Sequence, residues 1–66
     1  MVLKMLGQKI KTARKEAKLR QEDLADMVGT TKSVISEYET GKRNISVKEL
    51  EKISFALGRT LRIDLD

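Results

Sequence analysis

The feature that most constrains this chain is a set of small and apolar residues at fixed intervals between residues 21 and 38. Counted from Gln21, alanine falls fifth (Ala25) and glycine falls ninth (Gly29). A small fifth residue lets two helices approach closely, and glycine adopts a left-handed turn without steric cost. The pattern therefore predicts helices over residues 21–28 and 32–39 that meet at a steep angle. The wedge between them would be filled by the side chains at the fourth, eighth, fifteenth and eighteenth positions, namely Leu24, Val28, Ile35 and Tyr38.

A further helix is predicted on each side of this pair. Near the N-terminus, apolar residues recur at helical spacing: Leu3, Leu6, Ile10, Ala13 and Ala17. The opposite stripe is almost wholly basic, which for a lone helix favours a solvated face; it comprises Lys4, Gln8, Lys11, Lys15 and Lys18. After residue 45, Ser46 and Glu49 have the spacing of a capping box. The inward stripe of that last helix is predicted to be Val47, Leu50, Ile53 and Leu57, with Gly58 as its end.

The C-terminal segment, residues 59–66, changes period. From Thr60 to Asp66 polar and apolar residues alternate, which is typical of a β-strand. Because the chain has no second convincing strand, we expect this one to pair with the same segment of a second copy across a two-fold axis. A frayed tail and a last helix are the alternatives. Phe55 lies off the main helical stripe, and the expected dimer surface is Phe55, Leu61, Ile63 and Leu65.

Composition narrows the functional classes. The chain of 66 residues, which we expect to form a single domain over residues 1–66, has no cysteine and no histidine. It therefore lacks a disulfide framework, thiolate metal ligands and the commonest general base, and we expect neither an enzyme nor a cofactor or metal. No apolar run approaches a membrane span, so a cytoplasmic protein is expected. Residues 1–20 carry net charge +6, residues 21–40 carry −4 and residues 41–66 carry +2. A basic chain permits nucleic-acid binding without proving it.

The residues of the inter-helix pattern and their neighbours resemble the xenobiotic-response-element (XRE) family, which includes the lambdoid phage repressors and Cro. The resemblance spans Gly7 to Leu57 and rests on Arg14, Leu19, Gln21, Leu24, Ala25, Gly29, Thr30, Ile35, Ser36, Glu39, Gly41 and Leu50–Leu57. It implies an all-α, lambda-repressor-like bundle of four or five helices with a helix-turn-helix, whose third helix enters the DNA major groove. In similar proteins an arginine at the position of Arg14 pairs with the glutamate at Glu39, so a structural ion pair is expected here.

Given that placement, the outward side chains of the third helix are the expected base readers: Lys32, Ser33, Ser36 and Glu37. A solvated helix face is the alternative for all four. Phosphate contacts are expected around this helix, from Arg20, Gln21, Thr30, Thr31, Lys42, Arg43 and Asn44. Arg20 departs from the small capping hydroxyl usual in the family, so the second helix is expected to fray slightly more.

The function predicted is that of a sequence-specific transcriptional repressor that binds double-stranded DNA as a homodimer on a palindrome. A phage regulator, a restriction-system controller and an antitoxin that represses its own operon and binds a toxin are the alternatives within regulators. A protein–protein interaction module is the alternative outside them. No small-molecule ligand is expected, because nothing after residue 58 is large enough for an effector domain.

Overall fold

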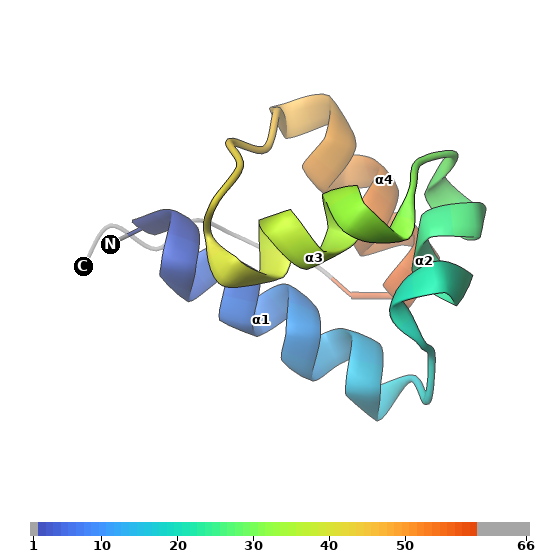
Figure 1. Ribbon diagram of the computed structural model, residues 1–66. Coiled ribbons are helices and arrows are strands. Elements are labelled where there is room, and N and C mark those ends of the chain that lie inside the picture. The colour runs from blue at the N-terminus through green and yellow to red at the C-terminus, as the bar shows by residue number, and fades with distance from the viewer. Residues whose placement is uncertain (1, 60–66) are drawn as a thin grey trace.

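The structure is a computed structural model that describes residues 2–59, and these residues form four helices. They are α1 (Val2–Glu16), α2 (Gln21–Val28), α3 (Lys32–Thr40) and α4 (Val47–Leu57). Helix α3 packs against α1 and α2, and α4 packs against α2 and less extensively against α1 (Figure 1). The predicted all-helical bundle is confirmed for the described residues, with four helices rather than five. Within them no helix combines the length and the apolar content that a membrane crossing requires.

Glycines and polar caps fix the ends of the last three helices. Gly29, Gly41 and Gly58 follow α2, α3 and α4 with φ of 75°, 77° and 67°, the left-handed conformation that glycine adopts without a Cβ clash. At the other end of α3, the hydroxyl of Thr31 accepts a hydrogen bond of 3.3 Å from the Val34 N–H. These local signals explain why the predicted bounds of α2 hold and why α3 runs only one residue longer than predicted.

A single aliphatic core joins the four helices. Its most enclosed side chains come from each helix in turn, with Ile10, Leu24, Ile35 and Ile53 at 0–1 % exposure. The remaining buried apolar residues are Leu6, Ala13, Ala25, Val28, Tyr38 and Leu57. The wedge residues predicted between α2 and α3 are therefore all in the core.

The inward stripes predicted for the outer helices are too long at their ends. Ala17 is exposed because α1 ends at Glu16 and the chain turns at Lys18, which has a positive φ of 60°. Val47 is 73 % exposed, so its predicted inward position is wrong. It occupies the first position of α4, beyond the edge of the core, and Ile45 from the preceding loop packs against the core instead.

Only half of the capping box predicted for α4 is present in the described structure. The Ser46 hydroxyl accepts a hydrogen bond of 3.1 Å from the Glu49 N–H. The Glu49 carboxylate lies 3.6 Å from the Lys52 ammonium rather than on the Ser46 backbone. The strand predicted over residues 59–66 falls outside the described residues except for Arg59, whose N–H closes the α4 turn on the Ser54 carbonyl.

The contact between α1 and α3 depends on a glycine to which the sequence analysis gave no role. A Cβ at Gly7 would lie 2.6 Å from the Glu39 carbonyl oxygen and closer still to that of Tyr38. Only a residue without a side chain lets the backbones of α1 and α3 approach this closely. Gly7 thereby fixes the position of α1 beside the C-terminal half of α3.

Candidate nucleic-acid interface

Helix α3 has one face in the core and one at the surface. Ile35, Tyr38 and Glu39 are buried on the inner face. The four predicted base readers lie on the other side, where Lys32 and Ser33 are exposed and Ser36 and Glu37 are half-buried. Their spacing of one, four and five residues places them on one continuous stripe of the helix. The fold thus holds α3 from behind and presents these four side chains together.

A buried ion pair anchors the inner face of α3 to α1. The Arg14 Nε donates to Glu39 Oε2 at 2.6 Å, and a second guanidinium nitrogen donates to Oε1 at 3.2 Å. The Arg14 guanidinium also donates to the Leu19 carbonyl at 2.8 Å, and the Gln21 amide donates to Glu39 Oε1 at 3.0 Å. Arg14 and Glu39 are only 7 % and 3 % exposed. The network fixes α1, the start of α2 and the end of α3 relative to one another.

The same network limits what Gln21 can offer to a ligand. Gln21 is a predicted phosphate contact, but its side-chain amide points inward to Glu39. The groups at the start of α2 that remain for an anion are therefore its first backbone N–H groups, which have no partner within the helix.

Arg20, another predicted phosphate contact, is held by acidic residues of α2. Its guanidinium donates to both carboxylate oxygens of Asp23, at 3.1 and 3.0 Å, and lies 3.7 Å from Glu22. The hydrogen bond from the Arg20 side chain is the main reason that the pKa of Asp23 is lowered. Asp23 also accepts from the Arg20 backbone N–H at 2.9 Å, which is the bond that the N3 carboxylate makes in a capping box at the start of α2.

A second arginine joins the two predicted classes of DNA contact. Arg43, a predicted phosphate contact in the loop after α3, donates from Nε to Glu37 Oε1 at 2.7 Å. Both side chains are nearly half exposed, at 49 % and 43 %. Both residues were predicted to contact DNA, but their pairing was not predicted. The signal for it was the pair of opposite charges six residues apart across the Gly41 turn.

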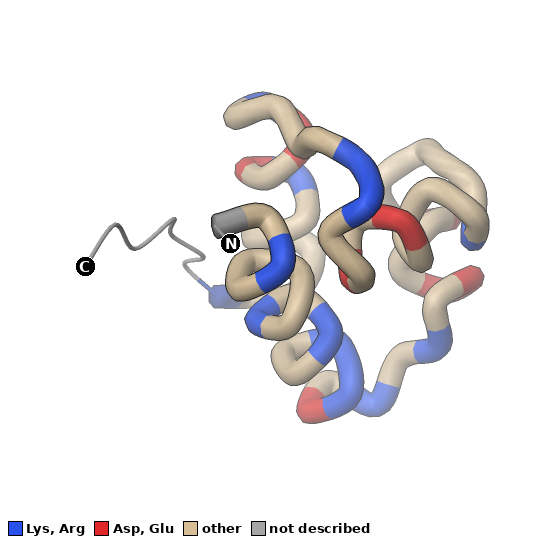
Figure 2. Tube along the Cα trace, turned by 60° about the vertical axis from the view of Figure 1, so that its left-hand side comes forward, with Lys and Arg blue, Asp and Glu red and all other residues tan. Residues whose placement is uncertain are grey.

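The other predicted phosphate contacts flank α3 at its two ends. Before the helix, Thr30 is half-buried and Thr31 is exposed, and the Thr31 hydroxyl is already used as the helix cap. After the helix, Lys42 and Asn44 are exposed beside Arg43. Figure 2 shows basic segments both in this loop and along α1. The structure therefore brings the predicted base and phosphate contacts onto neighbouring surfaces around α3.

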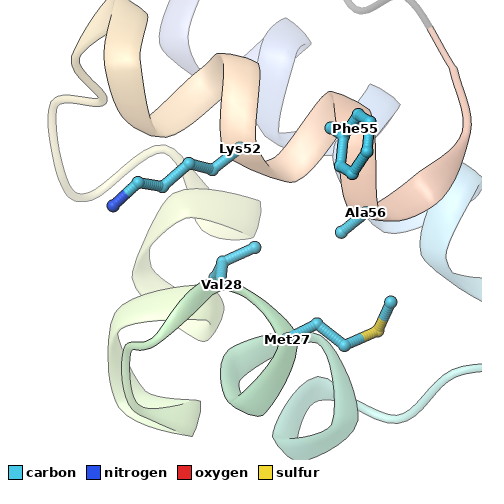
Figure 3. Close-up of a pocket in the computed structure, with 5 residues that line it drawn as sticks. All are labelled: Met27, Val28, Lys52, Phe55 and Ala56. Carbon is cyan, nitrogen blue, oxygen red and sulfur yellow. The ribbon is translucent and has the colours of Figure 1, made fainter.

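Phe55, the predicted dimer residue within the described range, lies at a groove between α2 and α4. Its side chain is 90 % exposed and that of Met27 is 54 % exposed. The two border a hollow of about 500 Å³ that Val28, Lys52 and Ala56 complete (Figure 3). Exposed large apolar side chains that border a groove often mark an interaction surface. The other predicted dimer residues, Leu61, Ile63 and Leu65, lie outside the described residues.

Comparison with known proteins identifies the family of this chain. The model of a helix-turn-helix family matches residues 10–63. The control protein C.MunI from a Mycoplasma species is 46 % identical over 56 residues, which are 83 % of this chain and 76 % of that protein. The immunity repressor of Bacillus phage phi105 is 40 % identical over 53 residues, which are 80 % of this chain but 37 % of that repressor.

A solved structure supports the same assignment. The restriction-modification controller protein C.AhdI from Aeromonas hydrophila is similar, with a TM-score of 0.84 and 33 % identity over 88 % of this chain and 84 % of that one. Both the match to the family model and the similarity to the C.AhdI fold agree with the arrangement of α2 and α3 described above. The chain belongs to the helix-turn-helix family of the XRE/Cro–C1 type.

Proposed function

We propose that the protein is a transcriptional repressor that binds double-stranded DNA in a sequence-specific manner, with α3 in the major groove. The observation that carries the proposal is the two-sided character of α3. Ile35, Tyr38 and Glu39 fix its inner face in the core, while its outer face presents short polar and charged side chains. The relatives, a control protein and an immunity repressor, support the same function.

The proposed base contacts follow from the chemistry of the outer face. Lys32 can donate to guanine O6 and N7, and Glu37 can accept from the cytosine amino group. Ser33 and Ser36 can serve several bases. The flanking groups, above all Lys42, Arg43 and Asn44 after α3, and the backbone N–H groups that open α2, are proposed to hold the phosphates on either side.

We further propose that two copies act together on a palindromic site. A domain of this size contacts too few base pairs for useful specificity, and dimers on half-sites one helical turn apart solve that problem. The Met27–Phe55 groove between α2 and α4 supports a dimer surface at this place. The alternating segment of residues 60–66 is proposed to extend that surface.

Among the regulators left open by the sequence, we favour a restriction-system controller, because proteins of that class are similar to this chain in both sequence and fold. Besides C.MunI and C.AhdI, the control protein C.BamHI from Bacillus amyloliquefaciens is 40 % identical over 55 residues. Adjacent restriction and methyltransferase genes whose promoter the protein controls would support this assignment.

The test begins with selection of bound fragments from random DNA, followed by titration of the enriched duplex. We expect one enriched palindrome, bound with an affinity that falls steeply with salt. Lys32→Ala should relax preference at one base pair, at a cost of about 1–3 kcal/mol on the preferred base. Lys42→Ala should weaken all sequences alike. Absence of salt-dependent DNA binding by the wild-type protein would refute the function and favour a protein-binding module.

A further inference from the structure

A polar cleft lies between α1 and the outer edge of α3. It has a volume of about 420 Å³, and α1 contributes Lys4, Gln8 and Lys11 to its lining. From α3 it receives Ser36, one of the proposed base readers, and Thr40. The basic stripe of α1, which as a lone helix would be a solvated face, therefore runs beside the face of α3 that is proposed to meet DNA.

Two glycines bring the lysines to this place. Gly7 allows the close approach of the α1 and α3 backbones described above. Gly41, which ends α3, packs on the N-terminal turn of α1, where an added Cβ would lie 2.9 Å from the Lys4 Cα. The contact is between backbones, so the position of Lys4 beside the end of α3 is fixed by the fold.

The charge that the cleft presents to a ligand is positive. Within residues 2–59 neither Lys4 nor Lys11 forms an ion pair, whereas Arg20, Arg43, Lys52 and Arg59 each lie within 4 Å of a carboxylate. The one acidic residue of the cleft, Glu39, is 3 % exposed and already accepts hydrogen bonds from Arg14 and Gln21. The cleft is thus lined by four residues whose side chains can donate hydrogen bonds to an anion: Lys4, Gln8, Lys11 and Ser36.

We propose that this cleft binds one phosphate of the DNA backbone next to the groove that α3 enters, with Lys4 and Lys11 as the ligands. The inference rests on the proposed function, because it requires α3 to lie against a duplex. Lysine ammonium groups bind phosphate as point charges, and side-chain hydroxyls and amides commonly share such contacts. The cleft adds a contact from α1 to those expected from the ends of α2 and α3.

The test compares two double variants with the same loss of charge. Lys4→Gln/Lys11→Gln removes both ammonium groups of the cleft. Lys15→Gln/Lys48→Gln, the control variant, removes two exposed cations that line neither the cleft nor the Met27–Phe55 groove. Each is titrated at several salt concentrations against the duplex enriched from random DNA, and thermal unfolding and sedimentation are measured in parallel.

We expect the cleft variant to bind more weakly and its slope of log affinity against log salt to fall by about 0.9 for each subunit bound, the value for one phosphate contact. The control variant should keep the wild-type slope, and both variants should remain folded with the oligomeric state of the wild type. If the cleft variant keeps the wild-type slope of log affinity against log salt, the proposal is overturned, whether or not the variant is less stable to heat. Lys4 would then be only a structural partner of the α3 C-terminus. An equal fall in the control would overturn it too, since net charge would then explain the effect. Failure of the wild-type protein to bind DNA would instead refute the proposed function.

Discussion

Replacement of Arg14 by methionine tests whether the buried pair with Glu39 supports the fold or contacts DNA. The Arg14 side chain is only 9 % exposed and that of Glu39 is 2 % exposed, so the variant would leave a buried carboxylate without its cation. Loss of one partner of a buried pair typically costs about 3–5 kcal/mol. We expect about 3 kcal/mol, the lower end of that range, because the Gln21 amide still donates to Glu39.

That loss is large for a chain of 66 residues. Domains of this size are stable by about 3–10 kcal/mol, so the variant should retain little stability, and a substantial fraction of its molecules should be unfolded. Urea unfolding followed by far-UV circular dichroism at low temperature measures the change in midpoint, and the slope of the transition reports whether unfolding stays two-state.

The control is the double variant Arg14→Met/Glu39→Met, which replaces both charges with flexible apolar side chains. Replacement of a whole buried pair by apolar residues is often neutral or stabilising, so the double variant should recover most of the lost stability. The reasoning is refuted if Arg14→Met keeps wild-type stability within about 0.5 kcal/mol, the usual range for surface changes, yet binds DNA more weakly. It is refuted as well if the double variant is no more stable than the single one.

Three further predictions concern other contacts. Gly7→Ala should destabilise the fold by about 1–3 kcal/mol, because the cost of overpacking against fixed carbonyls exceeds the roughly 1 kcal/mol gained in helix propensity. Thermal unfolding measures this loss, and Gln8→Ala at an exposed position of the same helix is the control. Asp23→Ala should lower the melting temperature at neutral pH more than Glu22→Ala does. The pKa of Asp23 is lowered on folding, so its contribution to stability is present above the ordinary aspartate value of 3.8 and is lost as the pH falls through the folded pKa. Below that pH the difference in melting temperature between variant and wild type should vanish. Phe55→Ser should weaken self-association by about tenfold or more in sedimentation, whereas Val47→Ser, also exposed on α4, should not. If the two variants form dimers with the same affinity, the groove is excluded as the dimer surface.

Helix positions could be predicted because their signals are local. The left-handed glycines after α2, α3 and α4 and the hydroxyl caps of Thr31 and Ser46 act within a few residues of chain. Periodicity likewise identifies which residues share a face. It does not show where the core ends, which is why Val47 was predicted to point inward although it is 73 % exposed at the first position of α4.

Contacts between helices depended on information that spacing does not contain. The role of Gly7 follows from the crossing of α1 over the end of α3, and a glycine within a helical pattern gives no sign of this on its own. Gln21 was assigned to DNA because it begins a helix, but the approach of Glu39 from α3, 18 residues away, turns its amide inward. The acid partners of Arg20 and Arg43 were visible as nearby charges, and only the side-chain geometry shows that both arginines are paired.

The pairing of Arg43 with Glu37 has a consequence for how the proposed complex gains specificity. An exposed pair of this kind contributes about 0–1 kcal/mol, so a DNA phosphate can readily take Arg43 from Glu37. The freed carboxylate would then face the major groove without its cation, close to the negative backbone. A cytosine amino group at that position can satisfy it, and a good contact of this type discriminates by about 1–3 kcal/mol, whereas a base that offers only acceptors leaves the charge unpaired. A phosphate contact that every sequence provides would thereby expose a carboxylate that only some sequences can satisfy. Because Arg43→Ala removes that phosphate contact and leaves Glu37 without its cation in every complex, the variant should bind all sequences more weakly but keep or sharpen the base preference at Glu37.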